Sequence, residues 1–106
     1  MTGKLTYNGA CVLQALSKGA GYGFDVMDLT GLPSGTVYPI LRRFEEAGWV
    51  TSRWEDEDDA HQEGRPRRRH YELTDQGASA LSMAAERYRM HAQLFDQPAP
   101  TGPRRP

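Results

Sequence analysis

Two groups of arginines give this sequence its clearest chemistry. Arg42 and Arg43 stand side by side, and a second group lies within one short segment: Arg65, Arg67, Arg68 and Arg69. A guanidinium binds phosphate oxygens through its charge and through paired hydrogen bonds. The formal net charge of the chain is only -1, but contact with phosphates depends on the local field of a basic surface. A local basic surface for nucleic acid is thus possible, but on charge alone the favoured interpretation of the charge run is a solvated segment.

Six acids stand directly before the second arginine group: Glu55, Asp56, Glu57, Asp58, Asp59 and Glu63. One interpretation is a solvated segment in which these acids pair with arginines of the same chain. The other is that Arg65-Pro66-Arg67, which Pro66 keeps extended, lies along a row of phosphates or enters a minor groove. Both interpretations hold if the acids form ion pairs with the arginines in the free protein and DNA phosphates displace the acids on binding.

Residues of the kinds needed for catalysis do not form a recognisable set. Cys11 is the only cysteine, which excludes an internal disulfide, and neither a Ser-His-Asp arrangement nor a glycine-rich phosphate loop is present. His61, His70 and His91 share no helical spacing. We therefore expect no enzyme, no cofactor and no metal site, with a metal site from Glu55 to His61 left open as an alternative.

The elements that position the arginines follow from hydrophobic spacing and from breaks in it. Apolar residues at helical spacing predict three helices, and the break at Gly31-Leu32-Pro33 separates the second from the third, for which Ser34 is a suitable N-cap. Two alternating segments predict a hairpin, and Thr74 caps a final helix. The expected ranges are helices at 5–18, 22–30, 34–47 and 75–95, strands at 49–54 and 68–73, and a polar loop at 55–66.

This order predicts a fold that is mainly α with a small β-hairpin, namely a winged helix-turn-helix followed by a C-terminal dimerisation helix. The second helix offers four residues to the core: Phe24, Val26, Met27 and Leu29. The third helix buries one stripe, made of Val37, Ile40, Leu41 and Phe44, and turns its other face outward.

The outward face of the third helix and the hairpin tip form the expected DNA-binding surface. For Arg42 and Arg43 the alternative is ion pairing with Glu45 and Glu46, and Tyr38 suits either the core or a phosphate. The full set of expected DNA-binding residues is Tyr22, Ser34, Gly35, Thr36, Tyr38, Pro39, Arg42, Arg43, Arg65, Arg67 and Arg68.

Two segments resemble the PadR family of transcriptional regulators. The first runs from Gly31 to Val50 and contains Ser34-Gly35-Thr36-Val37-Tyr38-Pro39, and the second runs from Gly64 to Gly77. Tyr22-Gly23-Phe24-Asp25 is similar to the opening of that family's second helix. The likeness covers about residues 5–96 and implies a dimeric winged helix-turn-helix regulator, often a repressor relieved by a small molecule. A single C-terminal helix is typical of the short branch, whereas the acidic run is heavier than the family pattern.

The last helix carries a heptad seam with the spacing of a coiled coil: Ala78, Leu81, Ala85, Tyr88, Ala92 and Phe95. We expect this seam, together with Leu5 and Val12, to form a homodimer interface, because the first three helices and the hairpin leave the last helix little else to pack on. A second strip of Met83, Met90 and Leu94 lets one helix serve both the partner and its own domain. The resemblance implies a planar aromatic effector held between subunits, at Ala85, Tyr88, Ala92 and Phe95, although close helix packing without a cavity fits the alanines equally.

The chain is thus expected to hold a DNA-binding domain at 1–73, a dimerisation helix at 74–96 and a disordered tail at 97–106. The expected partners are a double-stranded DNA operator, a second copy of the chain and a small-molecule effector, with no membrane. The expected location is the cytoplasm, because neither a signal peptide nor a membrane span is evident. A winged helix that binds protein without DNA and a metal-responsive regulator are the alternatives.

Overall fold

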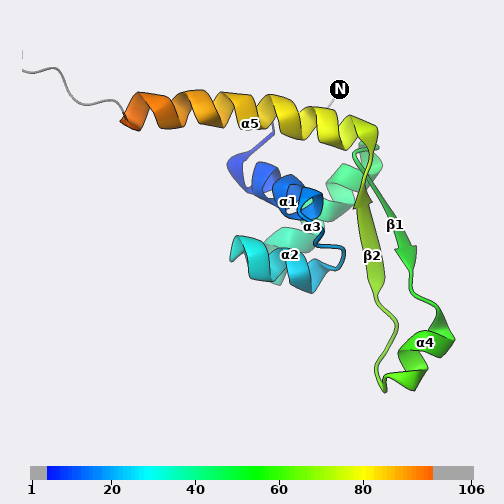
Figure 1. Cartoon of the computed structure of the whole chain (residues 1–106). Helices are drawn as coiled ribbons and strands as arrows, with labels where there is room; N and C mark the ends of the chain where they lie inside the picture. Colours follow the sequence, from blue (N-terminus) through cyan, green and yellow to red (C-terminus); the bar gives the residue numbers. More distant parts are fainter. Residues whose placement is uncertain (1–4, 97–106) are drawn as a thin grey trace, which may run out of the picture.

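The computed structural model describes residues 5–96, which form five helices and one antiparallel hairpin (Figure 1). None of the helices in this range is long and apolar enough to cross a membrane. The elements are α1 (Tyr7–Ser17), α2 (Gly23–Thr30), α3 (Ser34–Glu46), β1 (Val50–Trp54), α4 (Glu57–Gln62), β2 (Arg69–Leu73) and α5 (Asp75–Asp96). The predicted mainly α fold with a small hairpin is confirmed, and the predicted tail at 97–106 lies outside the described residues.

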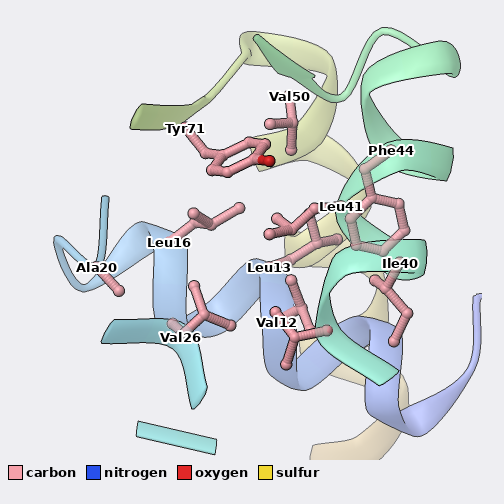
Figure 2. Packing of buried hydrophobic residues seen from close by; sticks show 12 residues of the cluster. Val12, Leu13, Leu16, Ala20, Val26, Ile40, Leu41, Phe44, Val50 and Tyr71 are labelled. Carbon is pink, nitrogen blue, oxygen red and sulfur yellow. The ribbon is translucent and has the colours of Figure 1, made fainter. Parts of the chain in front are cut away.

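Helices α1, α2 and α3 enclose a core of branched aliphatic side chains (Figure 2). Val12 and Leu13 of α1, Val26 of α2 and Leu41 of α3 have no exposed surface. Burying each such side chain contributes about 1.5–3 kcal/mol, so this contact stabilises the three-helix unit. Two residues expected in this core lie outside it, because Phe24 and Leu29 sit on the solvent side of the short α2 and are 40% and 59% exposed.

Helix α3 begins one residue earlier than its expected cap implies. Pro33 holds the N-cap position with extended backbone, and its carbonyl accepts hydrogen bonds from the backbone N–H groups of Thr36 and Val37 at 3.0 Å. Ser34 is therefore the first helical residue, and the prediction that it caps the helix is wrong. The predicted buried stripe of α3 is confirmed, since all four of its residues are buried.

The hairpin pairs Val50 with Leu73 and Trp54 with Arg69 in antiparallel register. Ser52 and Trp54 of β1 therefore share a face of the hairpin with Arg69 and Tyr71 of β2. The hairpin is fixed to the core at its middle, where Tyr71 is 9% exposed and its backbone N–H donates to the carbonyl of Gly21 at 2.7 Å. This bond ties β2 to the turn between α1 and α2, so the hairpin does not swing freely.

The segment between the strands is a short helix, where the sequence predicted a polar loop. Asp56 caps α4 by accepting hydrogen bonds from the N–H groups of Asp58 and Asp59, at 2.8 and 3.4 Å. The acids of the first turn suit the positive end of the helix dipole, and Ala60 is buried beneath them. We call the hairpin of β1 and β2, together with the segment that joins them, the wing. The acidic run therefore builds local structure at the tip of the wing.

Helix α5 begins at the predicted cap, where the N–H of Gly77 donates to the hydroxyl of Thr74 at 3.0 Å. Its first half lies over α1 (Figure 1), with Ala84 only 2% exposed. The expectation that the domain leaves α5 little to pack on is thus wrong for this half. From Arg89 to Asp96 every side chain is exposed, and this end of α5 extends past α1 as a free arm.

Gly77 gives a direct test of how α5 joins the domain. A Cβ at this position would collide with the backbone oxygen of Trp49 and with the side chain of Leu73, so Gly77→Ala should lower the free energy of unfolding by about 1–3 kcal/mol. Urea denaturation measures this change. Gly35→Ala is the matched control, because open space surrounds Gly35, and it should be neutral or stabilising by up to about 1 kcal/mol. Equal stability of the two variants would contradict the packing described.

Candidate nucleic-acid interface

The outward face of α3 exposes most of the residues expected to contact DNA. Ser34, Gly35, Tyr38, Pro39 and both arginines are exposed, whereas Thr36 is half-buried. Arg42 and Arg43 take part in none of the ion pairs found within residues 5–96. The alternative in which they pair with Glu45 and Glu46 is therefore not what the structure shows, and both guanidinium groups remain available on this face.

A half-buried carboxylate organises the base of the wing. The Glu55 side chain is only 13% exposed and accepts hydrogen bonds from the Arg65 guanidinium at 2.6 and 3.0 Å. It also accepts from the backbone N–H of Arg68 at 2.8 Å and from the Tyr22 hydroxyl at 2.9 Å. We call Glu55, Tyr22, Arg65 and Arg68 the Glu55 cluster. It joins the start of α2 to both ends of the wing segment.

Electrostatics within the Glu55 cluster favour the charged carboxylate. Hydrogen bonds from Arg65, and then from Arg68 and Tyr22, hold the pKa of Glu55 well below its usual range despite its burial. The hydrogen bond to Glu55 in turn raises the pKa of the Tyr22 hydroxyl. The Tyr22 hydroxyl expected to contact DNA is therefore already bonded inside the protein.

Arg68 is held on its other side by aromatic rings. Tyr22 and Phe24 stack in parallel with their centroids 5.4 Å apart, and the Arg68 guanidinium lies over them at 4.4 and 4.8 Å. Stacking of arginine on aromatic faces adds a cation–π attraction to the ion pair with Glu55. For Arg65 and Arg68, pairing with an acid of the same chain is the interpretation that the structure supports.

A second polar link joins α3 to the hairpin. The Ser52 hydroxyl donates to Glu45 at 2.6 Å, and Arg69 donates to Ser52 at 2.8 Å and to Glu45 at 3.3 Å. These residues lie near the C-terminal end of α3 and on one face of the hairpin. Together with the Glu55 cluster, this link fixes the angle between the hairpin and α3.

Arg67 is the arginine of the group from Arg65 to Arg69 that these networks leave out. It forms no ion pair within the described part of the chain, and its guanidinium lies 5.2 Å from the centre of the half-exposed Trp54 ring. The arginines of this group therefore have two different roles. Arg65, Arg68 and Arg69 build the structure, and Arg67 presents its charge to solvent at the wing.

The residues expected at a dimer interface fall into three groups. Val12 has no exposed surface because it belongs to the core of its own chain, so its assignment to the interface is wrong. Leu5 is half-buried against that same core. Ala78, Ala92 and Phe95 are exposed.

Leu81, Ala85 and Tyr88 make up the third group and face their own α1. They line a cavity of about 530 Å³ that also includes Tyr7 of α1 and Leu29 of α2, and that we call the α1–α5 groove. Tyr7 and Tyr88 meet there edge to face with centroids 5.4 Å apart. Of the four expected effector residues, Ala85 and Tyr88 line this groove, whereas Ala92 and Phe95 lie on the free arm.

The remaining candidate ligands do not converge. Within residues 5–96 no group of three His, Cys, Asp or Glu side chains could hold a metal ion, so the metal alternative from Glu55 to His61 has no site to support it. Cys11 is half-buried in the wall of the α1–α5 groove. His70 packs its ring edge to face against Tyr22.

Sequence reasoning missed the central role of Glu55, and also Trp54, Arg69 and Phe24. The available signal was the hairpin register: if Trp54 pairs with Arg69, then the next residues, Glu55 and Arg68, stand opposite each other with opposite charges. Treating the six acids as one run concealed that Glu55 belongs to the strand end and the other five to the tip.

Three helices with a tight turn between the second and third, followed by a hairpin, define a winged helix-turn-helix protein. The model of the transcriptional regulator PadR-like family matches residues 12–83. The chain therefore belongs to this family of transcriptional regulators, whose members are not enzymes. A comparison with curated protein sequences gave no match.

Solved structures share the fold at low sequence identity. A PadR family transcription regulator from Clostridium difficile is 23% identical, with a TM-score of 0.73 over 86% of this chain and 96% of that one. BpsR of Bordetella bronchiseptica is 22% identical, with a TM-score of 0.70 over 92% and 70%. PcaV of Streptomyces coelicolor, solved with its natural ligand, is 23% identical, with a TM-score of 0.72 over 85% and 60%.

The lowered pKa of Glu55 predicts a pH dependence with a definite sign. Its stabilisation is fully present above the unfolded pKa of about 4.3 and is lost as the pH falls further toward the folded value. Wild type should therefore lose more stability than Glu55→Gln between about pH 5 and pH 3. Urea midpoints of both proteins across this range measure the difference, and parallel curves would contradict the role given to Glu55.

Proposed function

We propose that this protein binds double-stranded DNA sequence-specifically as a homodimer and acts as a repressor that a small-molecule effector releases. The proposal rests on three exposed arginines that form no ion pair within residues 5–96. Arg42 and Arg43 lie on the outward face of α3, and Arg67 lies on the adjacent wing. A regulator that acts on DNA works in the cytoplasm, and this location remains a prediction.

Helix α3 is the element suited to the major groove, which is about 12 Å wide. Its first turn carries small residues, Ser34 and Gly35, whose backbone N–H groups are free to meet a phosphate. About two turns further on, Arg42 is within reach of a guanine edge or a phosphate. In this arrangement the short side chains allow close approach, and the arginine supplies the sequence preference.

The wing supplies contact that does not depend on sequence. Arg67 reaches the phosphate backbone beside the groove that α3 enters, because the Glu55 cluster and the Glu45 link hold the hairpin at a fixed angle. Arg65 and Arg68 stay on Glu55 in this arrangement. The exposed acids of α4 repel phosphates and keep the rest of the tip away from DNA.

The free arm of α5 is the proposed dimer element. Met90, Leu94 and Phe95 are 60%, 66% and 85% exposed, and exposed apolar surface of this extent marks an interaction site. A twofold axis would place the arm of each chain on the α1–α5 groove of the other, so that both arms and both grooves are covered at once.

The effector is proposed to bind in the α1–α5 groove as a planar aromatic molecule. The groove volume lies within the range of about 300–1,000 Å³ typical of ligand pockets, and Tyr7 and Tyr88 provide aromatic walls. Among proteins of similar fold, PcaV was solved with its natural ligand, and the DNA binding of BpsR is regulated by 6-hydroxynicotinic acid. A ligand between α1 and α5 would change the spacing of the two α3 helices and release DNA.

A winged helix that binds a protein instead of DNA is the second candidate, favoured by the exposed acids of α4 and the net charge of -1. Such a module would show no salt-dependent binding to DNA.

Two arginine variants test the DNA-binding surface on an operator selected from random duplexes by the wild-type protein. Arg42→Ala should weaken operator binding by about 1–3 kcal/mol and relax sequence preference at one position. Arg67→Ala should weaken binding to all sequences alike and reduce the slope of log affinity against log salt by about one. Fluorescence anisotropy titrations at several salt concentrations measure both effects.

Arg65→Ala is the matched control, since Arg65 lies in the same wing but is bonded to Glu55. Its salt slope should stay close to that of wild type. An unchanged affinity in both Arg42→Ala and Arg67→Ala would contradict the DNA-binding proposal and favour the protein-binding module.

A substitution on the free arm tests the dimer without disturbing the core. Phe95→Asp should give monomers in analytical ultracentrifugation at concentrations where wild type is a dimer, because it places a charge in an apolar contact. Ser79→Asp, at an exposed position near the other end of α5, should remain dimeric. A dimeric Phe95→Asp protein would show that the arm is not the interface.

A further inference from the structure

A second cavity lies where the start of α2, the outward face of α3 and the hairpin meet. Its volume is about 330 Å³, and we call it the hairpin cleft. It is separate from the α1–α5 groove, with which it shares no lining residue. Every residue that lines it except Gly23 carries an aromatic ring or a guanidinium group: Tyr22, Phe24, Tyr38, Trp54, Tyr71, Arg68 and Arg69.

The chemistry of these walls selects one class of ligand. Aromatic walls alone would suit a flat ring or an organic cation. Arg68 and Arg69 would repel a cation, however, and no carboxylate is among the residues that line the cleft. A flat ring that carries a negative group meets both kinds of wall, because guanidinium binds a carboxylate in paired hydrogen bonds.

Both arginines are held in place with donors to spare. Arg68 donates to Glu55 through Nε and Nη2, and Arg69 donates through Nε to Ser52 and through Nη2 to Glu45. Neither set of bonds uses Nη1, so each guanidinium keeps two N–H donors for a ligand. The walls are therefore ordered before binding, which reduces the entropy that binding costs.

We propose that the hairpin cleft binds a planar aromatic carboxylate of about one ring. The ring lies against the aromatic walls, and the carboxylate accepts hydrogen bonds from Arg68 and Arg69. Tyr38 of α3 is part of the cleft wall, so an occupant also stands between α3 and the wing. Given the proposed DNA-binding function, such a ligand excludes DNA directly, without any change in the dimer.

Fluorescence quenching tests the site, because Trp54 lines the cleft whereas Trp49 packs against Phe44 in the core. The probes are 4-nitrobenzoate and 4-nitrobenzamide, which match in shape and differ in charge. In Trp49→Phe, where Trp54 is the one tryptophan left, 4-nitrobenzoate should quench saturably and bind about tenfold or more tightly than the amide. In Trp54→Phe the saturable quenching should disappear.

Two variants locate the contact within the cleft. Arg69→Gln should remove the preference for the carboxylate, and its melting temperature shows whether the hairpin remains folded. Tyr38→Leu is the second variant, since Tyr38 is exposed on α3 and carries no hydrogen bond within residues 5–96. It should weaken both probes equally by removing aromatic wall.

Equal affinity for the two probes, quenching without saturation, or saturable quenching that persists in Trp54→Phe would each overturn the proposed site. Operator binding is measured on the same protein without probe, so a failure of DNA binding is seen separately. With an operator in hand, 4-nitrobenzoate should lower operator affinity and 4-nitrobenzamide should not. Probe binding with unchanged operator affinity would overturn the exclusion of DNA.

Discussion

The carboxylate of Glu55 holds the hairpin against the start of α2, and the geometry of the whole outward surface depends on it. Six donors from three residues, Tyr22, Arg65 and Arg68, converge on its two oxygens. A buried charge is stable only when it is paired and hydrogen-bonded in this way. Loss of this one group would leave Arg68 without an ion pair and Arg65 with Glu63 as its remaining partner, and the angle between the wing and α3 would no longer be fixed.

Fixing the wing also decides which positive charges remain for a partner. Glu55 takes Arg65 and Arg68, and Glu45 takes Arg69 through Ser52. Arg42 and Arg43 on α3, and Arg67 and Arg53 on the hairpin, form no ion pair within residues 5–96. A chain with a net charge of -1 can in this way present a small basic surface, because Glu45 and Glu55 pair with other arginines and the acids of α4 lie at the tip.

The sequence predicts well those features that a repeating pattern encodes. The buried stripe of α3 and the pairing of the two strands follow from spacing alone, since side-chain direction repeats along helices and strands. Spacing does not say whether an apolar face packs against its own domain or against a second chain. Val12 and Leu81 are expected at the dimer interface from the sequence, yet both pack within their own domain. The strand register separates Glu55 from the acids beside it, but its partial burial and the convergence of donors on it arise only when the hairpin docks on α2.

The most direct test of this account is an NMR titration of the arginine Nε–Hε signals with a selected operator. The signals of Arg67, Arg42 and Arg43 should shift as DNA is added. The signals of Arg65 and Arg68 should already be protected from solvent exchange in the free protein and should stay in place. Shifts of Arg65 and Arg68 as large as that of Arg67 would show that DNA opens the Glu55 cluster and would contradict the division of roles described.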